Sequence, residues 1–221
     1  MIENHKNREK KTKIALVCYS LSNGGLERVV SNYSFMFSEM GLDVHVYVLR
    51  SEIDYPFAGT LHSFDIENFS GSEKIRKYIQ LRKSIRNTTF DLIIDHRYRL
   101  NPIQEFLWQQ FIYKNQKVVN YVHSSDLSKY LFPYRWANNL IFGKRRFICV
   151  SKGIEQKIQR MFPDLSTATV YSPVIPQNNP DPDISETPDS FILAVARMDR
   201  TNVKQIDVLL ECFAKSNLPS K

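Results

Sequence analysis

The amino-acid sequence predicts an α/β fold, a doubly wound parallel sheet covered by helices on both faces. Short apolar runs alternate along most of the chain with longer segments whose apolar residues recur at every third or fourth position. The short runs are continuously apolar, which is typical of strands buried on both faces of a parallel sheet. With 43% hydrophobic and 24% charged residues over 221 positions, the chain can bury a sizeable core and is too apolar for wholesale disorder.

The first elements follow each other in strand–helix order. The apolar run at residues 13–20 predicts a buried strand, and helical spacing follows over residues 26–40. Gly41 is placed to end that helix. Residues 43–49 predict a second strand, and residues 60–66 predict a weaker one.

The same alternation continues through the middle of the chain. Strands are predicted at 90–96, 117–123 and 146–151, and helices at 72–87, 102–113 and 152–162. Ser151 can cap the last of these helices with its hydroxyl. Repeated strand-then-helix units argue for one parallel sheet rather than an antiparallel one.

The composition changes near the C-terminus. Residues 172–189 carry five prolines and no helical period, which predicts a linker. A fresh strand and an amphipathic helix follow it, which is too little to bury a core, so a second domain is predicted to begin at residue 190 and to be incomplete. We therefore expect a basic tail at 1–12, a main domain at 13–171, the linker, and the start of a second domain at 190–221.

Charge and cysteine usage narrow the range of partners and compartments. The net charge of +7 suggests an anionic partner: nucleic acid, acidic lipid or a phosphorylated ligand. Cys18, Cys149 and Cys212 are isolated, which favours reduced thiols over a metal site. No run approaches the roughly 18 apolar residues of a membrane span. These features predict a cytoplasmic protein, which could still rest on the inner face of the cell membrane.

Two of the chain's seven glycines, Gly24 and Gly25, lie side by side where the first strand gives way to the first helix. They either turn the chain or let the backbone approach a ligand closely. A helix N-terminus preceded by glycines suits a phosphate group. The segment has neither the G-x-G-x-x-G dinucleotide fingerprint nor the G-x-x-x-x-G-K-[ST] P-loop.

Three segments together resemble the retaining glycosyltransferases of family four, which have the GT-B fold of two Rossmann-like domains facing a cleft. In chain order they are SNGGLERVV, RFICVSKGI and FILAVARMDRTNVKQIDVLLECFAK. The resemblance extends over nearly the whole chain from Lys13 onward. It is looser at two positions, because Ala196 and Gln205 stand where the family usually has glycine.

The resemblance implies a role for several residues. Gly24 and Gly25 would let the backbone approach the donor's diphosphate, and Arg197 and Lys204 would neutralise that group from the second domain. His123 would lie at the cleft as the catalytic histidine, near the transferred sugar and the acceptor. Candidates for acceptor contact are the residues that end a neighbouring strand on the same rim, Asp95, His96 and Arg97.

Ordinary structural roles remain open for each of these residues. Arg197 and Lys204 could be surface cations, His123 could be held by a backbone partner, and residues 95–97 could be a solvated strand end. The mechanism implied by the resemblance needs no metal and no cofactor, since the nucleotide sugar is the substrate and its leaving diphosphate can take the acceptor's proton.

The predicted function is therefore sugar transfer with retention, from a nucleotide sugar to a glycan or lipid-linked acceptor, plausibly in bacterial surface polysaccharide synthesis. The glutamate pair that the family uses to bind the donor is missing, so the chain alone is expected to be inactive.

The alternative is a non-catalytic module that binds an acceptor or a membrane. The basic amphipathic helix could lie on anionic lipid through Lys74, Arg76, Lys77, Arg82, Lys83 and Arg86. A nucleic-acid binder is less favoured, because the sequence has no aromatic RNA-binding motif and no basic recognition helix.

Overall fold

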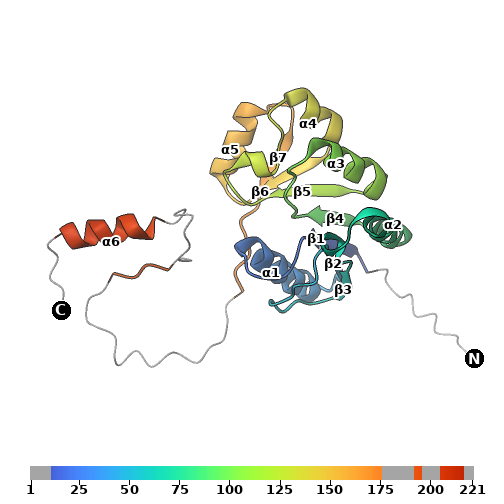
Figure 1. Ribbon diagram of the computed structural model, residues 1–221, viewed down its shortest axis with the longest axis horizontal. Coiled ribbons are helices and arrows are strands. Elements are labelled where there is room, and N and C mark those ends of the chain that lie inside the picture. Colours follow the sequence, from blue (N-terminus) through green and yellow to red (C-terminus); the bar gives the residue numbers. More distant parts are fainter. Residues whose placement is uncertain (1–10, 176–191, 196–204, 217–221) are drawn as a thin grey trace, which may run out of the picture. The chain divides into compact units, whose positions relative to one another are not determined.

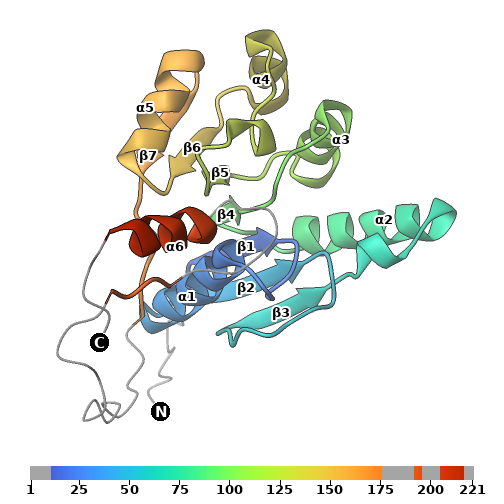
Figure 2. The ribbon, with the colours of Figure 1, turned by 60° about the vertical axis from the view of Figure 1, so that its left-hand side comes forward.

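Seven parallel strands form one sheet in the order β3-β2-β1-β4-β5-β6-β7 within the residues that the computed structural model describes, 11–175, 192–195 and 205–216. This order can be followed in Figure 1 and Figure 2. The strands are β1 (Lys13–Cys18), β2 (Asp43–Val48), β3 (Thr60–Ser63), β4 (Leu92–Asp95), β5 (Val118–Val122), β6 (Arg146–Cys149) and β7 (Ser166–Thr169). The predicted α/β fold class with a doubly wound parallel sheet is confirmed.

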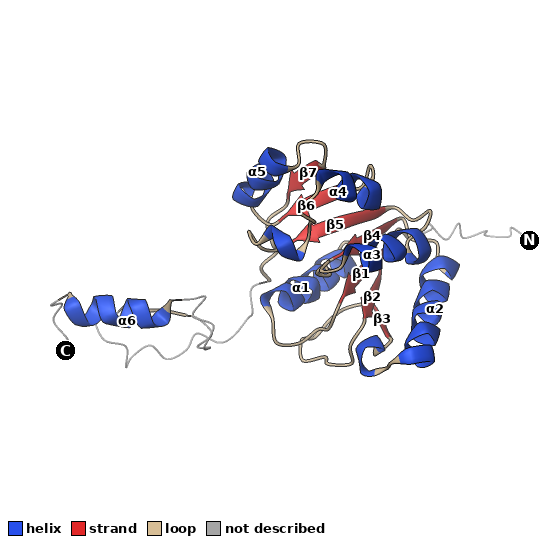
Figure 3. Ribbon diagram, turned by 45° about the horizontal axis from the view of Figure 1, so that its top comes forward, coloured by secondary structure: helices blue, strands red, loops and turns tan. Residues whose placement is uncertain are grey.

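Helices connect successive strands except β2 and β3, which a loop joins, as Figure 3 shows. They are α1 (Gly25–Glu39), α2 (Gly71–Asn87), α3 (Pro102–Leu107), α4 (Arg135–Phe142) and α5 (Lys152–Met161), with single turns η1 (Ile66–Asn68) and η3 (Leu127–Lys129). Ser151 caps α5 as predicted, since its Oγ accepts a hydrogen bond from the Ile154 backbone N–H at 3.4 Å.

The central strand β1 buries both of its faces. Val17 packs into one cluster with Leu81 of α2, whereas Leu16 packs into another with Val30 of α1. Alternate residues of a strand point to opposite faces of the sheet, so these two clusters lie on its two sides. This double burial explains why β1 reads as a continuous apolar run.

Three local features differ from the sequence prediction. The helix predicted over 102–113 is split, because α3 passes into a π-helical segment, η2 (Trp108–Ile112). The edge strand β7 was not predicted, because its sequence, STAT, contains no apolar run. Helix α4 was also not predicted. Tertiary hydrogen bonds help to hold it, with the Asn138 amide donating to the Phe132 carbonyl at 2.8 Å and accepting from the Phe132 backbone N–H at 2.9 Å.

The chain divides into two compact units, Met1–Pro176 and Gln177–Lys221. In the second unit, the predicted helix is present as α6 (Ile206–Lys215). Residues 192–195 have no regular secondary structure, where the sequence predicts a strand. A single strand has no partner to complete its backbone hydrogen bonds, which accounts for that difference. The predicted domain boundaries stay a prediction.

None of the described helices is long and apolar enough to cross a membrane.

Candidate functional site

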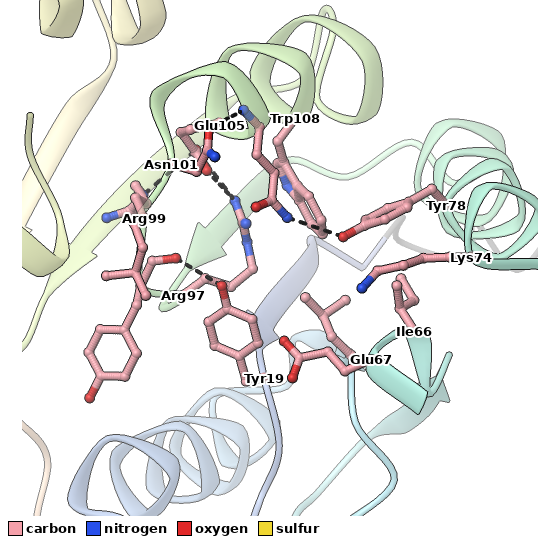
Figure 4. A pocket seen from close by; sticks show the side chains of 14 residues that line it. Tyr19, Ile66, Glu67, Lys74, Tyr78, Arg97, Arg99, Asn101, Glu105 and Trp108 are labelled. Atoms are coloured by element: carbon pink, nitrogen blue, oxygen red, sulfur yellow. Dashed lines mark hydrogen bonds and ion pairs between the residues drawn. The ribbon is translucent and has the colours of Figure 1, made fainter. Parts of the chain in front are cut away.

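A pocket lies where the strand order of the sheet reverses, between β1 and β4. Ligands of doubly wound sheets bind at this topological switch point, outside the carboxyl ends of the strands. The cavity has a volume of about 230 Å³. We call it the switch-point pocket. Figure 4 shows its lining side chains and labels Tyr19, Ile66, Glu67, Lys74, Tyr78, Arg97, Arg99, Asn101, Glu105 and Trp108.

Arg97, Arg99 and Glu105 line the pocket, and they form a network of buried charges with Asp95, which lies behind them. Arg97 Nη2 lies 2.8 Å from Asp95 Oδ2 and 3.2 Å from Glu105 Oε2. Arg99 Nη2 lies 3.7 Å from Asp95 Oδ2, and Arg99 Nε lies 3.8 Å from Glu105 Oε1. All four side chains are at most 3% exposed. We refer to them as the four-charge network.

The local sequence explains how these charges meet. Asp95 ends β4, so the two arginines follow it in the segment that leaves the sheet. Glu105 comes from α3, where Pro102 occupies the first turn and Asn101 Oδ1 accepts from the Ile103 backbone N–H at 3.0 Å. The cap fixes the start of the helix and thereby places the Glu105 carboxylate over Arg97.

The charges of the network cancel, which makes their burial tolerable. Burial on its own would lower the pKa of the Arg97 guanidinium, but Asp95 and Glu105 beside it raise that pKa well above its usual value. The guanidinium also lies over the Trp108 ring, 3.6 Å from its centroid. Arg97 is therefore a permanently charged part of the wall.

The residues predicted at the rim of the sheet are in fact enclosed. Asp95 and His96 are completely buried and Arg97 is 2% exposed, where the sequence suggested a solvated strand end or an acceptor-contacting rim. Their mutual hydrogen bonds and ion pairs account for this, because buried charges must be paired. Arg97 still borders the switch-point pocket, and acceptor contact by these residues stays a prediction.

His123 follows β5 and pairs with His96, which follows β4. His96 Nδ1 and His123 Nε2 are 2.9 Å apart, so one of the two rings donates a hydrogen bond to the other. Both rings stack on Tyr121, whose hydroxyl lies 2.6 Å from that of Tyr33 in α1. His96 is buried, whereas His123 is partly exposed. The pair thus links an interior residue to one that can meet a ligand.

Both histidines are neutral near pH 7. Burial, and to a smaller extent Arg99, lowers the pKa of His123 to about 3. Burial also lowers the pKa of His96 well below its usual value, and the neighbouring His123 adds to this effect. A neutral His123 can position a hydroxyl group by hydrogen bonding without carrying charge into the site.

Gly24 and Gly25 lie at the N-terminus of α1, as predicted. Gly24 is extended, with φ of −143°, and Gly25 is the first helical residue. The left-handed residue in this turn is Asn23, with φ of 58°, so the backbone conformation does not require glycine at either position. A Cβ on Gly25 would meet no atom within 4 Å, and a Cβ on Gly24 would meet only the movable Glu27 carboxylate. The helix N-terminus is therefore open beside Gly25, whereas the Glu27 carboxylate lies beside Gly24.

The predicted positive half of the diphosphate clamp, Arg197 and Lys204, lies outside the described residues. The structure brings His96 and His123 together and joins Asp95 to Arg97. It shows no direct contact between these described residues and the glycine pair.

Several lining residues of the pocket were not predicted. Tyr78, Gln104, Glu105 and Trp108 come from α2, α3 and η2, and each looks like an ordinary amphipathic helix position in the sequence. Only the Asn-Pro start of α3, followed by Glu105, offered a signal, because it fixes which turn of that helix faces the strand ends.

Comparison with known proteins decides the family. The sequence model of Glycosyltransferase Family 4 matches residues 23–177, which is most of the chain. The chain belongs to this glycosyltransferase family. The match spans the glycine pair, the four-charge network and the histidine pair. No significant match was found among curated protein sequences.

Solved structures give more distant similarities. WaaG, a glycosyltransferase involved in lipopolysaccharide biosynthesis, is 15% identical at a TM-score of 0.47, over 71% of this chain and 44% of that one. A glycosyltransferase from Rickettsia africae ESF-5 is 11% identical at a TM-score of 0.47, over 73% of this chain and 43% of that one. The family 4 chain described here thus spans less than half the length of either protein.

The lowered pKa of His123 predicts how stability changes with pH. In the unfolded chain a histidine takes up a proton below about pH 6.5, whereas in the folded protein His123 stays neutral until about pH 3. The free energy of unfolding should therefore fall as the pH drops below 6.5, by up to about 1.4 kcal/mol per pH unit for this residue. His123→Gln keeps a hydrogen-bonding partner for His96 and removes the titration. Urea unfolding at pH 7.5, 6.5 and 5.5 should show a smaller loss for the variant, and equal losses in both proteins would contradict the assignment.

Proposed function

We propose that this family 4 glycosyltransferase chain contributes to sugar transfer from a nucleotide sugar to a glycan or lipid-linked acceptor, with retention of anomeric configuration. The observation that carries the proposal is the family match across residues 23–177. It is supported by a pocket with polar and aromatic lining at the switch point of the sheet, which is where this fold class binds its ligands. A role in bacterial surface polysaccharide synthesis is part of the same proposal.

The donor's diphosphate is assigned to the open N-terminus of α1. The backbone N–H groups and the partial positive charge of the helix favour an anion there, and the Glu27 carboxylate that now lies at this end would move aside for the diphosphate. Because neither Gly24 nor Gly25 carries a side chain, the phosphate oxygens can approach the backbone directly. Arg197 and Lys204 are proposed to supply the balancing positive charge as the glycosidic bond breaks.

The chemistry we assign to the site needs neither a metal ion nor a cofactor. The acceptor hydroxyl attacks the anomeric carbon from the face that the diphosphate leaves, and the departing phosphate oxygen takes the hydroxyl proton. His123 hydrogen-bonds the reacting sugar or the acceptor, and the Asp95, His96 and Arg97 group supports the acceptor side. A non-catalytic module that only binds the acceptor is the rival account.

Membrane association is proposed for α2. Its six cations lie on a helix that also exposes Ile75 and Ile79, at 62% and 48%. Among the described residues, Lys83 and Arg86 have no ion-pair partner. Basic residues beside exposed apolar side chains suit the interface of an anionic bilayer.

Substitution of Gly25 tests the diphosphate assignment. Gly25→Ala adds a methyl group to open space, so folding should be unaffected or slightly stabilised. The methyl group would separate phosphate oxygens from the backbone, so the Kd for the nucleotide sugar should rise about tenfold, equivalent to roughly 1.4 kcal/mol. The Kd is measured by calorimetric titration of the 221-residue chain with a panel of nucleotide sugars, because the chain alone is expected to be inactive.

Gly153→Ala is the matched control, because Gly153 also lies in the first turn of a helix with no atom within 4 Å of an added Cβ. Equal effects of the two substitutions would refute the role of Gly25. An absence of binding to every nucleotide sugar would refute the transferase proposal in favour of the module that binds only an acceptor.

The charge of α2 provides the membrane test. Replacing Arg76, Lys83 and Arg86 with Gln should weaken binding to phosphatidylserine-containing vesicles by roughly 100-fold, since each cation near such a surface contributes about 1 kcal/mol. Co-sedimentation measures the partition. The control replaces Lys144, Arg146 and Arg160 with Gln, which changes the net charge by the same amount. Arg146 lies in β6, Lys144 just before it, and Arg160 in α5. If both triple variants lose binding equally, α2 is not the docking surface.

A further inference from the structure

The switch-point pocket adjoins an apolar groove with which it shares part of its wall. The groove lies between α2 and the α3–η2 segment and has a volume of about 580 Å³. The residues common to the pocket and the groove are Lys74, Tyr78, Gln104 and Trp108. The pocket and the groove therefore lie on either side of the same four side chains.

The pocket side of this wall is suited to a polyhydroxylated group. Gln104 Nε2 donates to the Tyr78 hydroxyl at 3.3 Å. Figure 4 shows the Tyr78 ring beside Trp108, and the two ring centroids are 5.7 Å apart. The Lys74 ammonium has no ion-pair partner among the described residues. Amide, hydroxyl and ammonium groups next to aromatic rings offer donors and acceptors to sugar hydroxyls and an apolar surface to the C–H face of the ring.

The four-charge network leaves no net charge at the floor, and Lys74 on the shared wall is the one lining cation without an ion-pair partner among the described residues. The two carboxylates and two guanidinium groups of the network cancel, and Glu67 is held by Arg50, with Arg50 Nε 2.6 Å from Glu67 Oε2. A neutral polyol can hydrogen-bond to such a wall without leaving a buried charge uncompensated.

The groove side has the opposite chemistry. Ile75, Ile79, Leu107 and Phe111 all line it, and they are 62%, 48%, 57% and 42% exposed. A contiguous exposed apolar surface of this kind marks a binding site rather than an ordinary protein surface. Because the groove continues from a polar pocket, an occupant that fills both must be polar at one end and apolar at the other.

We propose that the switch-point pocket and the α2–α3 groove form one composite site for an acceptor with a sugar head group and a hydrocarbon chain, the head in the pocket and the chain in the groove. This inference rests on the proposed transferase function and specifies its acceptor class. The head group would then lie at the carboxyl ends of the strands, on the same edge of the sheet as His123. The hydrocarbon chain would point away from that edge, along the groove.

Trp108 provides a direct readout, because it lines both halves of the site and the chain has only two tryptophans. Trp136→Phe, in the 221-residue chain, leaves Trp108 as the only tryptophan. Its fluorescence is titrated with octyl and methyl glycosides of glucose, galactose, mannose and N-acetylglucosamine, and with octanol, all below micelle-forming concentrations. At least one octyl glycoside should bind at least tenfold more tightly than its methyl counterpart and than octanol, since each buried methylene contributes up to about fourfold.

Two matched variants locate the hydrocarbon chain. Ile79→Ser removes an exposed apolar side chain from the groove, and Leu140→Ser removes one from a different apolar depression between α3 and α4. Both side chains are surface positions, so both variants should fold. Ile79→Ser should abolish most of the advantage of the octyl over the methyl glycoside, and Leu140→Ser should leave it unchanged.

The proposal is overturned if affinity does not depend on chain length, if octanol binds as well as every octyl glycoside, or if the two variants lose the same affinity. These results are separable from the titrations with nucleotide sugars. Binding of a nucleotide sugar without any octyl effect would refute the composite site alone. Chain-length-dependent binding of glycosides without binding of any nucleotide sugar would refute the transferase proposal and leave the site in place.

Discussion

The four-charge network at the end of β4 is the interaction on which the rest of the site depends. It joins Asp95, on a strand at the centre of the sheet, to Glu105 on α3 through the guanidinium groups of Arg97 and Arg99. These side chains are buried, so any one of them left alone would cost several kcal/mol. The segment between strand and helix therefore has one arrangement in which all four charges are compensated. That arrangement places Arg97 beneath Trp108 and shapes the floor of the switch-point pocket.

The network also connects the pocket to the histidine pair. Arg99 Nη2 donates to the Asp95 carbonyl at 3.0 Å, and its charge helps to keep His123 neutral. His96, next to Asp95 in sequence, pairs with His123 on the neighbouring strand. Fixed charges in the interior and neutral rings at the edge give a site that can donate and accept hydrogen bonds without carrying a net charge. The family 4 glycosyltransferase assignment is consistent with such a site.

The sequence predicted the parallel sheet and most of its helices well, because burial on both faces of the sheet requires continuous apolar runs in the strands and helical apolar spacing between them. The continuous run around Leu16 and the helical spacing around Val30 belong to elements packed against each other. It predicted the site only in part. Residues 95–97 were recognised as chemically interesting, but their burial depends on Glu105, which lies on a helix that pattern alone cannot orient. The glycine pair was located correctly, yet its freedom from backbone strain could be known only from the turn geometry at Asn23.

Backbone amide hydrogen exchange, compared between the Glu105→Gln variant and the wild type, tests most directly whether the network fixes the wall of the pocket. The substitution leaves two buried guanidinium groups facing one carboxylate. Backbone amides of residues 97–112 should then exchange at least about tenfold faster than in the wild type, while those of β1 and β2 keep a larger share of their protection. Such a result would show that the charges fix the pocket wall locally. Unchanged exchange at residues 97–112, or a uniform loss across the sheet, would contradict this account.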